Sequence, residues 1–171
     1  TSDQTFTAHF VKDNFGYTVN HIYLNRDGSE AGRNQIEDSA EYESTIPYVT
    51  NLTYQGKTYV LNHVEGAGKK ITVNPAANVI NVYYDVDMIG TGTNPDAPDD
   101  VPDKDQLIFT YVSGDNGSIG KTKEVVTKVN GAASPSGTTA TPDTGYEFEK
   151  WTDGSMTDTD SGMAALKENT Y

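Results

Sequence analysis

The chain of 171 residues has no cysteine, so it contains no disulfide, no thiolate metal ligand and no thiol nucleophile. Long apolar runs are missing as well, because no stretch approaches the ~18 consecutive apolar residues of a membrane span. The N-terminal residues Thr1–Gln4 lack the basic and apolar regions of a signal peptide. We therefore expect a fragment of a longer or already processed protein, with no membrane insertion in this part.

Basic residues are scarce: 12 Lys and Arg stand against 25 Asp and Glu, which gives a formal net charge of -13 and a pI near 4.4. Such a surface repels phosphate backbones and anionic membranes, which argues against both as partners. Apolar residues make up only 35 % of the chain, whereas the 11 tyrosines and 16 glycines are plentiful. Small modules with thin cores fit this composition better than one large core.

Alternating apolar and polar residues over 17–24 predict a half-buried strand, which is followed by a tight turn at Asn25–Gly28. The two best helix candidates, Asn34–Ser44 and Met163–Lys167, are short and polar. The fold class that we predict is therefore mainly β. Further strands are predicted at Thr5–Val11, Leu52–Tyr54, Lys57–Leu61, Lys70–Val73, Val79–Tyr84, Leu107–Val112, Glu124–Val129 and Tyr146–Trp151.

Residues 88–106 break this pattern, since they hold three prolines, five aspartates and few apolar residues. Proline favours extended geometry and like charges repel, so this composition predicts a semi-rigid linker. We accordingly divide the chain into a first β module at 1–87, a linker at 88–106 and a second module at 107–171.

Little in the chain indicates catalysis. The three histidines, His9, His21 and His63, lie in or beside strand patterns and far apart in sequence. No Gly-x-Ser-x-Gly elbow occurs, and the glycines near Gly66–Lys70 and Gly114–Gly120 lack the spacing of a phosphate loop. Acidic pairs are too common here to identify a glycosidase. We expect a protein that is not an enzyme.

Two kinds of ligand site remain open. Clustered carboxylates offer hard oxygen ligands for calcium, the one cofactor that we leave open, although neither cluster has EF-hand spacing and a solvated acidic loop is the alternative. Exposed aromatic rings are the usual platform for sugars, against the alternative that they build the cores. The calcium candidates are Asp153, Asp158 and Asp160 in the second module and Asp96, Asp99, Asp100, Asp103 and Asp105 in the linker; the glycan candidates are Tyr42, Tyr48 and Tyr54.

Two families resemble parts of the chain. Residues 17–85, and above all the closing segment from Ile71 to Tyr84, resemble MucBP-type (mucin-binding-protein-like) repeats of Gram-positive surface proteins. Residues 109–171, through the segments 110–119 and 137–153, resemble the internalin B-repeat class. These resemblances imply two β-grasp-like modules, each with a short helix or loop that crosses a mixed sheet.

The segment Thr5–Phe10 has the alternation of a strand and resembles the closing strand of the second repeat type. Residues 1–10 are thus interpreted as the closing strand of a preceding repeat, which pairs with the second module of a neighbouring molecule. The alternative is an ordinary first hairpin with the strand at 17–24.

The resemblances imply an extracellular repeat region of a cell wall-anchored bacterial surface adhesin, which acts as a stalk or as an adhesive module. A carbohydrate-binding module for mucin glycans is the alternative, and an accessory region of a secreted glycan-active enzyme ranks third. The partners expected are neighbouring repeats of the same protein and a host mucin, glycan or protein ligand. Lysine isopeptide links are a further option that the sequence does not assign.

Overall fold

The computed structural model describes residues 4–91 and 97–151, and it confirms a mainly β fold with almost no helix. Within the described residues, no helix has the length and apolar character needed to cross a bilayer. Contacts between Cα atoms divide the chain into two compact units. Unit 1 comprises Thr1–Leu24, Glu30–Asn51 and Leu61–Tyr84, and unit 2 comprises Asn25–Ser29, Leu52–Val60 and Asp85–Tyr171.

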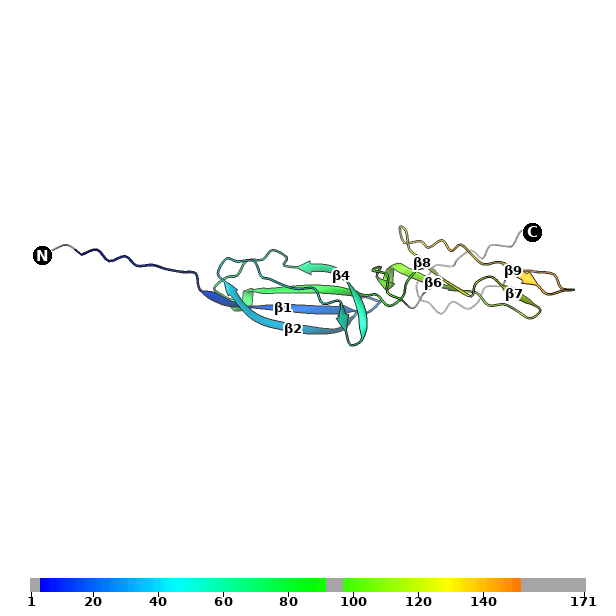
Figure 1. Ribbon diagram of the computed structural model, residues 1–171, viewed down its shortest axis with the longest axis horizontal. Coiled ribbons are helices and arrows are strands. Elements are labelled where there is room, and N and C mark those ends of the chain that lie inside the picture. Colours follow the sequence, from blue (N-terminus) through cyan, green and yellow to red (C-terminus); the bar gives the residue numbers. More distant parts are fainter. Residues whose placement is uncertain (1–3, 92–96, 152–171) are drawn as a thin grey trace. The chain divides into compact units, whose positions relative to one another are not determined.

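The largest sheet has five strands in the order β2-β1-β5-β4-β3 (Figure 1). Its longest pair is antiparallel, with β1 and β2 in register from Asn14 opposite Glu41 to Leu24 opposite Glu30. The turn between them contains Gly28, whose φ of 82° is the left-handed conformation that glycine adopts without strain. The strands are β1 (Asn14–Leu24), β2 (Glu30–Glu41), β3 (Thr53–Tyr54), β4 (Lys57–Glu65) and β5 (Val79–Val86).

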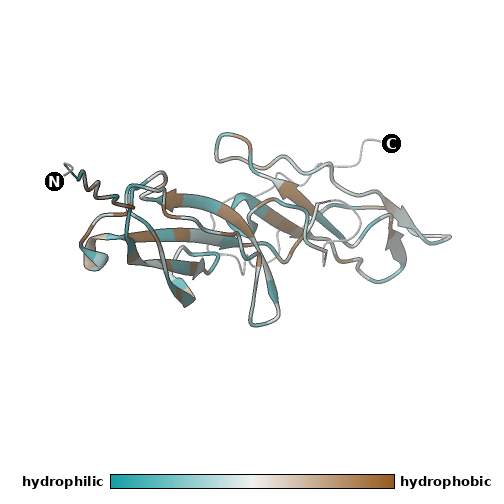
Figure 2. Ribbon diagram, turned by 60° about the vertical axis from the view of Figure 1, so that its left-hand side comes forward, coloured by the Kyte–Doolittle hydropathy of each residue, from teal (hydrophilic) through white to brown (hydrophobic). Residues whose placement is uncertain are grey.

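Every second residue of β1 and β5 faces the core, as the period of a strand requires. On β1 the buried series includes His21 and Tyr23, and on β5 it includes Tyr84. The Tyr23 and Tyr84 rings stack with centroids 5.1 Å apart, so aromatic rings fill much of this thin core. In Figure 2 the apolar stretches lie mainly along the strands.

The helix predicted at Asn34–Ser44 is wrong, because most of this segment belongs to β2. Nearly all of β2 is exposed or half-buried, and it lies at the edge of the sheet. Polar and charged residues suit such an edge because they discourage pairing with other chains. Pairing with β1 therefore decides the conformation of a segment whose own composition is ambiguous.

The segment Thr5–Phe10 belongs to no strand. The Phe6 and Phe10 side chains are 88% and 92% exposed, and β1 is flanked by β2 and β5. The alternative of an ordinary hairpin between this segment and residues 17–24 is therefore wrong. Pairing with another molecule stays a prediction.

In its described residues after Asp85, unit 2 contains two short antiparallel pairs, β6 (Gln106–Thr110) with β8 (Lys123–Thr127) and β7 (Gly117–Ile119) with β9 (Ala140–Pro142). Leu107, Tyr111 and Val125 are buried. Trp151 is half-buried, with its ring centroid 6.4 Å from that of Tyr111 and 5.6 Å from that of Phe148. The segment 146–151 forms no strand, nor does the one predicted at 70–73, where Lys70 makes only an isolated bridge with Thr45.

The described part of the acidic segment 88–106 is held by hydrogen bonds rather than freely extended. Carboxylates of this segment and of Asp87 accept main-chain N–H groups, and a short 3-10 turn forms at Asp103–Asp105. Such bonds between aspartate side chains and nearby N–H groups favour turns. These bonds fix parts of the segment, while its interpretation as a semi-rigid linker stays a prediction.

Candidate functional site

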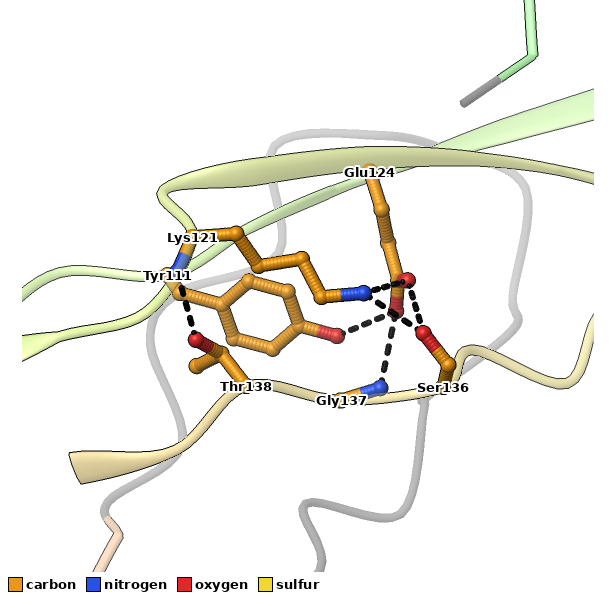
Figure 3. Close-up of polar contacts among 6 residues, drawn as sticks. All are labelled: Tyr111, Lys121, Glu124, Ser136, Gly137 and Thr138. Atoms are coloured by element: carbon orange, nitrogen blue, oxygen red, sulfur yellow. Dashed lines mark hydrogen bonds and ion pairs between the residues drawn. The ribbon is translucent and has the colours of Figure 1, made fainter. Parts of the chain in front are cut away.

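A connected polar cluster in unit 2 surrounds the buried side chain of Glu124 on β8 (Figure 3). Its Oε1 accepts the Tyr111 hydroxyl at 2.6 Å and the Gly137 main-chain N–H at 3.0 Å. Its Oε2 accepts the Lys121 ammonium at 2.5 Å and the Ser136 hydroxyl at 2.7 Å. The carboxylate thus has four donors, as many as a buried carboxylate can use.

These donors shift the acid–base equilibria of the cluster. Burial opposes the charge of Glu124, but the bonds from Lys121, Tyr111, Ser136 and Gly137 outweigh it and lower its pKa to about 2. The pKa of Tyr111 is raised by its burial and by its bond to the Glu124 carboxylate. Glu124 is therefore charged at neutral pH, and it ties the loop at 136–138 to the β6–β8 sheet.

The cluster brings a serine and a lysine together, which is one arrangement of a nucleophile and its base. The Lys121 ammonium lies 2.5 Å from the Ser136 hydroxyl oxygen. Lys121 Nζ donates to both Ser136 and Glu124, and the Ser136 hydroxyl donates to Glu124, whose pKa of about 2 makes it a weak base. This arrangement suits the stabilisation of a loop and does not provide a general base.

A second cluster, the polar sheet face, is formed in unit 1 by Asn20, His63, Glu65, Asn81 and Tyr83. The Asn20 amide donates to Asn81 Oδ1 at 2.8 Å, and the Asn81 amide donates to Glu65 Oε2 at 2.7 Å. The rings of His63 and Tyr83 stack with centroids 4.5 Å apart and planes 7° apart. His63 and Glu65 are exposed and the other three are half-buried, so the cluster is open to solvent.

The three histidines occupy different environments. His9 and His63 are exposed, whereas His21 is 1% exposed, with Nδ1 2.8 Å from the Tyr84 hydroxyl oxygen. Burial lowers the pKa of His21, so its neutral form is favoured in the fold. The Tyr84 hydroxyl also accepts the Asn51 main-chain N–H at 3.1 Å. His21 is therefore a buried core residue whose ring nitrogen bonds to another core side chain.

The glycan candidates are tyrosines that lie on separate segments. Tyr42 follows β2, is 36% exposed and meets Phe15 edge-on at 6.1 Å. Tyr48 is 40% exposed in the connection after β2, and Tyr54 is half-buried on β3. The sequence patterns did not predict the polar sheet face as a cluster. The alternation of Asn81 and Tyr83 with buried residues could have indicated that both lie on the same, more exposed side of the strand.

The calcium candidates Asp153, Asp158 and Asp160 lie outside the described residues. Among the residues that the structure does describe, no group of three or more histidine and acidic side chains is arranged as a ready metal cage. In the acidic segment Asp99 and Asp103 accept main-chain N–H groups, and Asp100 adopts a φ of 64°. Asp96 lies outside the described residues.

Comparison with known proteins bears on the second module. No curated protein and no solved structure matches the chain significantly. The MucBP-type resemblance of residues 17–85 has no support from these comparisons and stays a prediction. Residues 108–169 match the family model of the divergent InlB B-repeat domain. The second module therefore resembles the divergent InlB B-repeat domain, and that family is found in bacterial surface proteins.

Proposed function

We propose that the chain is an extracellular repeat region of a bacterial surface adhesin, where it acts as a stalk or an adhesive module without catalysis. The observation that carries this proposal is the InlB B-repeat-like module at 108–169. The acidic composition and the mainly β fold without cysteine agree with it.

The way in which the modules are stabilised supports a mechanical role. Few apolar side chains are buried in the described part of unit 2, and the Glu124 cluster fixes a loop to the sheet with four hydrogen bonds to a carboxylate. Buried hydrogen bonds of this kind specify a single arrangement of loops without a disulfide. A stalk needs such defined modules more than it needs a pocket.

Surface location is tested by antibody labelling of intact cells that produce the parent protein. We expect labelling before permeabilisation and its loss after the cells are treated with an external protease. Labelling that requires permeabilisation would contradict the proposal.

We further propose that the exposed segment Thr5–Phe10 pairs with the sheet of another repeat. Its alternation places Phe6, Ala8 and Phe10 on one face, and both phenylalanines are almost fully exposed. In the described part of unit 2 the β6–β8 sheet has only two strands, so its edge groups can accept another strand. A strand contributed in this way would connect successive repeats.

The alternative function, binding of a mucin-type glycan, is favoured by the polar sheet face. Sugars are recognised by amides and carboxylates that bind neighbouring hydroxyl groups and by aromatic rings that cover apolar ring faces. Asn20, Asn81 and Glu65 supply the first kind of group in one hydrogen-bonded row, and His63 with Tyr83 supplies the second. The net charge of -13 favours neutral over anionic sugars.

Binding of the whole chain to a glycan array separates the adhesive role from the stalk. If the polar sheet face binds, Tyr83→Ala and Asn81→Ala should each remove the signal, while Tyr146→Ala, which changes an exposed tyrosine outside this face, should keep it. A wild-type chain that binds no mucin-type glycan would reject the glycan-binding alternative and leave the stalk.

A further inference from the structure

Main-chain N–H groups bind the carboxylates of Asp87, Asp99 and Asp103 in and beside the acidic segment of unit 2. Asp103 Oδ1 accepts the N–H groups of Met88 and Ile89 at 2.8 and 3.1 Å, which places it beside Asp87. Asp87 accepts the N–H groups of Asp99 and Asp100 at 3.2 and 2.9 Å. These bonds connect the Asp87 carboxylate with the main chain at 99–100 and the Asp103 carboxylate with the main chain that directly follows Asp87.

This negative charge is buried and poorly compensated. Asp87 and Asp103 are 1% and 7% exposed. Within the described residues, no lysine or arginine side chain bonds to either carboxylate: the nearby Lys104 pairs with Asp85, and Arg26 donates to the main-chain carbonyls of Asp103 and Gln106. Buried charges in proteins are normally paired with an opposite charge or bound to a metal.

A second observation points to the same place. Gln106 is fully buried, and its amide lies against Asp99, to which Nε2 donates at 3.2 and 3.0 Å. Its Oε1 is the one buried side-chain oxygen or nitrogen of the described chain without a hydrogen-bond partner. A buried carbonyl oxygen without a donor destabilises the fold, and a bound cation would remove this cost.

The bonding pattern shows which oxygens are available. Asp99 already receives N–H groups at both oxygens, from Thr91 and Val101 as well as from Gln106. Asp87 receives one at each oxygen, so both keep a lone pair, and Asp103 Oδ2 receives none. The oxygens that still have a lone pair without a donor are thus those of Asp87, Asp103 Oδ2 and Gln106 Oε1.

We propose that Asp87, Asp103 and Gln106 bind one calcium ion, which compensates the buried carboxylates and fixes the acidic segment. Calcium accepts six to eight oxygen ligands of irregular arrangement, including carboxylates, amide carbonyls, main-chain carbonyls and water. Two carboxylates and one amide form a partial set, which agrees with the lack of a ready cage of three acidic side chains among the described residues. Water and main-chain oxygens would complete the coordination.

The decisive variant is Asp103→Asn. The asparagine Oδ1 can still accept the Met88 and Ile89 N–H groups, so the connection between residue 103 and residues 88–89 is retained. The substitution removes the second carboxylate oxygen, Oδ2, and the negative charge. The exposed Asp115→Asn change in the same unit is the matched control, because it alters the net charge equally. Thermal unfolding of the whole chain would be measured in EDTA and with calcium chloride or magnesium chloride.

At a calcium concentration about 100-fold above the dissociation constant, we expect the Tm of the wild type to rise by on the order of 5 °C. Asp115→Asn should show the same rise and Asp103→Asn should show none, although its Tm in EDTA is no lower than that of the wild type. Isothermal titration should give one calcium ion per chain, and the amide resonances of Met88 and Ile89 should shift on binding. A wild-type Tm that millimolar calcium leaves unchanged, or an equal rise in both variants, would overturn the proposal.

Discussion

Replacement of Glu124 by glutamine tests the role of the buried carboxylate in unit 2 most sharply. Glutamine can still accept the Tyr111 hydroxyl and the Gly137 N–H at one oxygen, but it turns an amide N–H₂ group toward the Lys121 ammonium. The substitution also removes the acceptor of the Ser136 hydroxyl. It therefore leaves a cation and a hydroxyl near the sheet without their partner.

The size of the effect follows from the pKa of Glu124. The fold lowers this pKa from 4.5 to about 2, and every tenfold change in proton affinity corresponds to about 1.4 kcal/mol. The charged carboxylate therefore stabilises unit 2 by about 3 kcal/mol at neutral pH. We expect Glu124→Gln to lower the free energy of unfolding by about this amount at pH 7.

The pH dependence has a definite sign. Because the pKa of Glu124 is lower in the folded chain, its contribution is complete above the ordinary value of 4.5 and is lost as the pH falls from 4.5 toward 2. The wild type should therefore approach the stability of the variant near pH 2. Urea unfolding followed by the fluorescence of Trp151, the single tryptophan and a neighbour of Tyr111, measures this.

The exposed Glu147 provides the control, since Glu147→Gln should change the stability at pH 7 by no more than about 0.5 kcal/mol. Two results would contradict this role of Glu124. One is a change in the free energy of unfolding of less than about 0.5 kcal/mol for Glu124→Gln at pH 7, and the other is a difference in this free energy between wild type and Glu124→Gln that is the same at pH 7 and pH 2.5.

Three further predictions concern unit 1. Asn78→Ala should lower the free energy of unfolding by about 3 kcal/mol or more, because the buried amide donates to the Gly16 and Thr72 carbonyls and accepts the Thr72 N–H. Urea unfolding followed by circular dichroism near 218 nm measures this loss, and a loss below about 1 kcal/mol would contradict the prediction. Because burial lowers the pKa of His21 below its ordinary 6.5, the unfolded chain binds the proton more tightly, so stability should fall as the pH drops below 6.5; an NMR titration midpoint of His21 above 6.5 would refute this. The double change Phe6→Ser and Phe10→Ser should alter the free energy of unfolding of unit 1 by no more than about 0.5 kcal/mol, because both side chains are exposed. It should weaken head-to-tail association in analytical ultracentrifugation, and a loss of unit 1 stability would reject strand pairing between molecules.

Alternation in the sequence predicted much of the sheet. The segments around Tyr17–Leu24 and Val79–Tyr84 became β1 and β5, because their aromatic and β-branched residues alternate with polar ones and half of them are buried. The strand β2 was missed because an edge strand buries little, so its polar residues carry no period that separates it from a loop or a short helix.

The polar clusters could not be predicted in the same way. The partners of Glu124 come from three segments between residues 111 and 137, and nothing in their local sequence shows that they meet. The hydrogen bonds of the aspartates in the acidic segment could not be predicted for a similar reason. The composition of this segment suggested repulsion, whereas the carboxylates of Asp99 and Asp103 accept main-chain N–H groups that only the folded backbone brings within reach.

We propose that this chain belongs to the outer face of a bacterium and acts there without catalysis. The most direct measurement is quantitative antibody labelling of intact, unpermeabilised cells that express the parent protein, compared with labelling of the same cells after lysis. We predict equal labelling in the two samples. Labelling that appears only after lysis would place the protein inside the cell and contradict the claim.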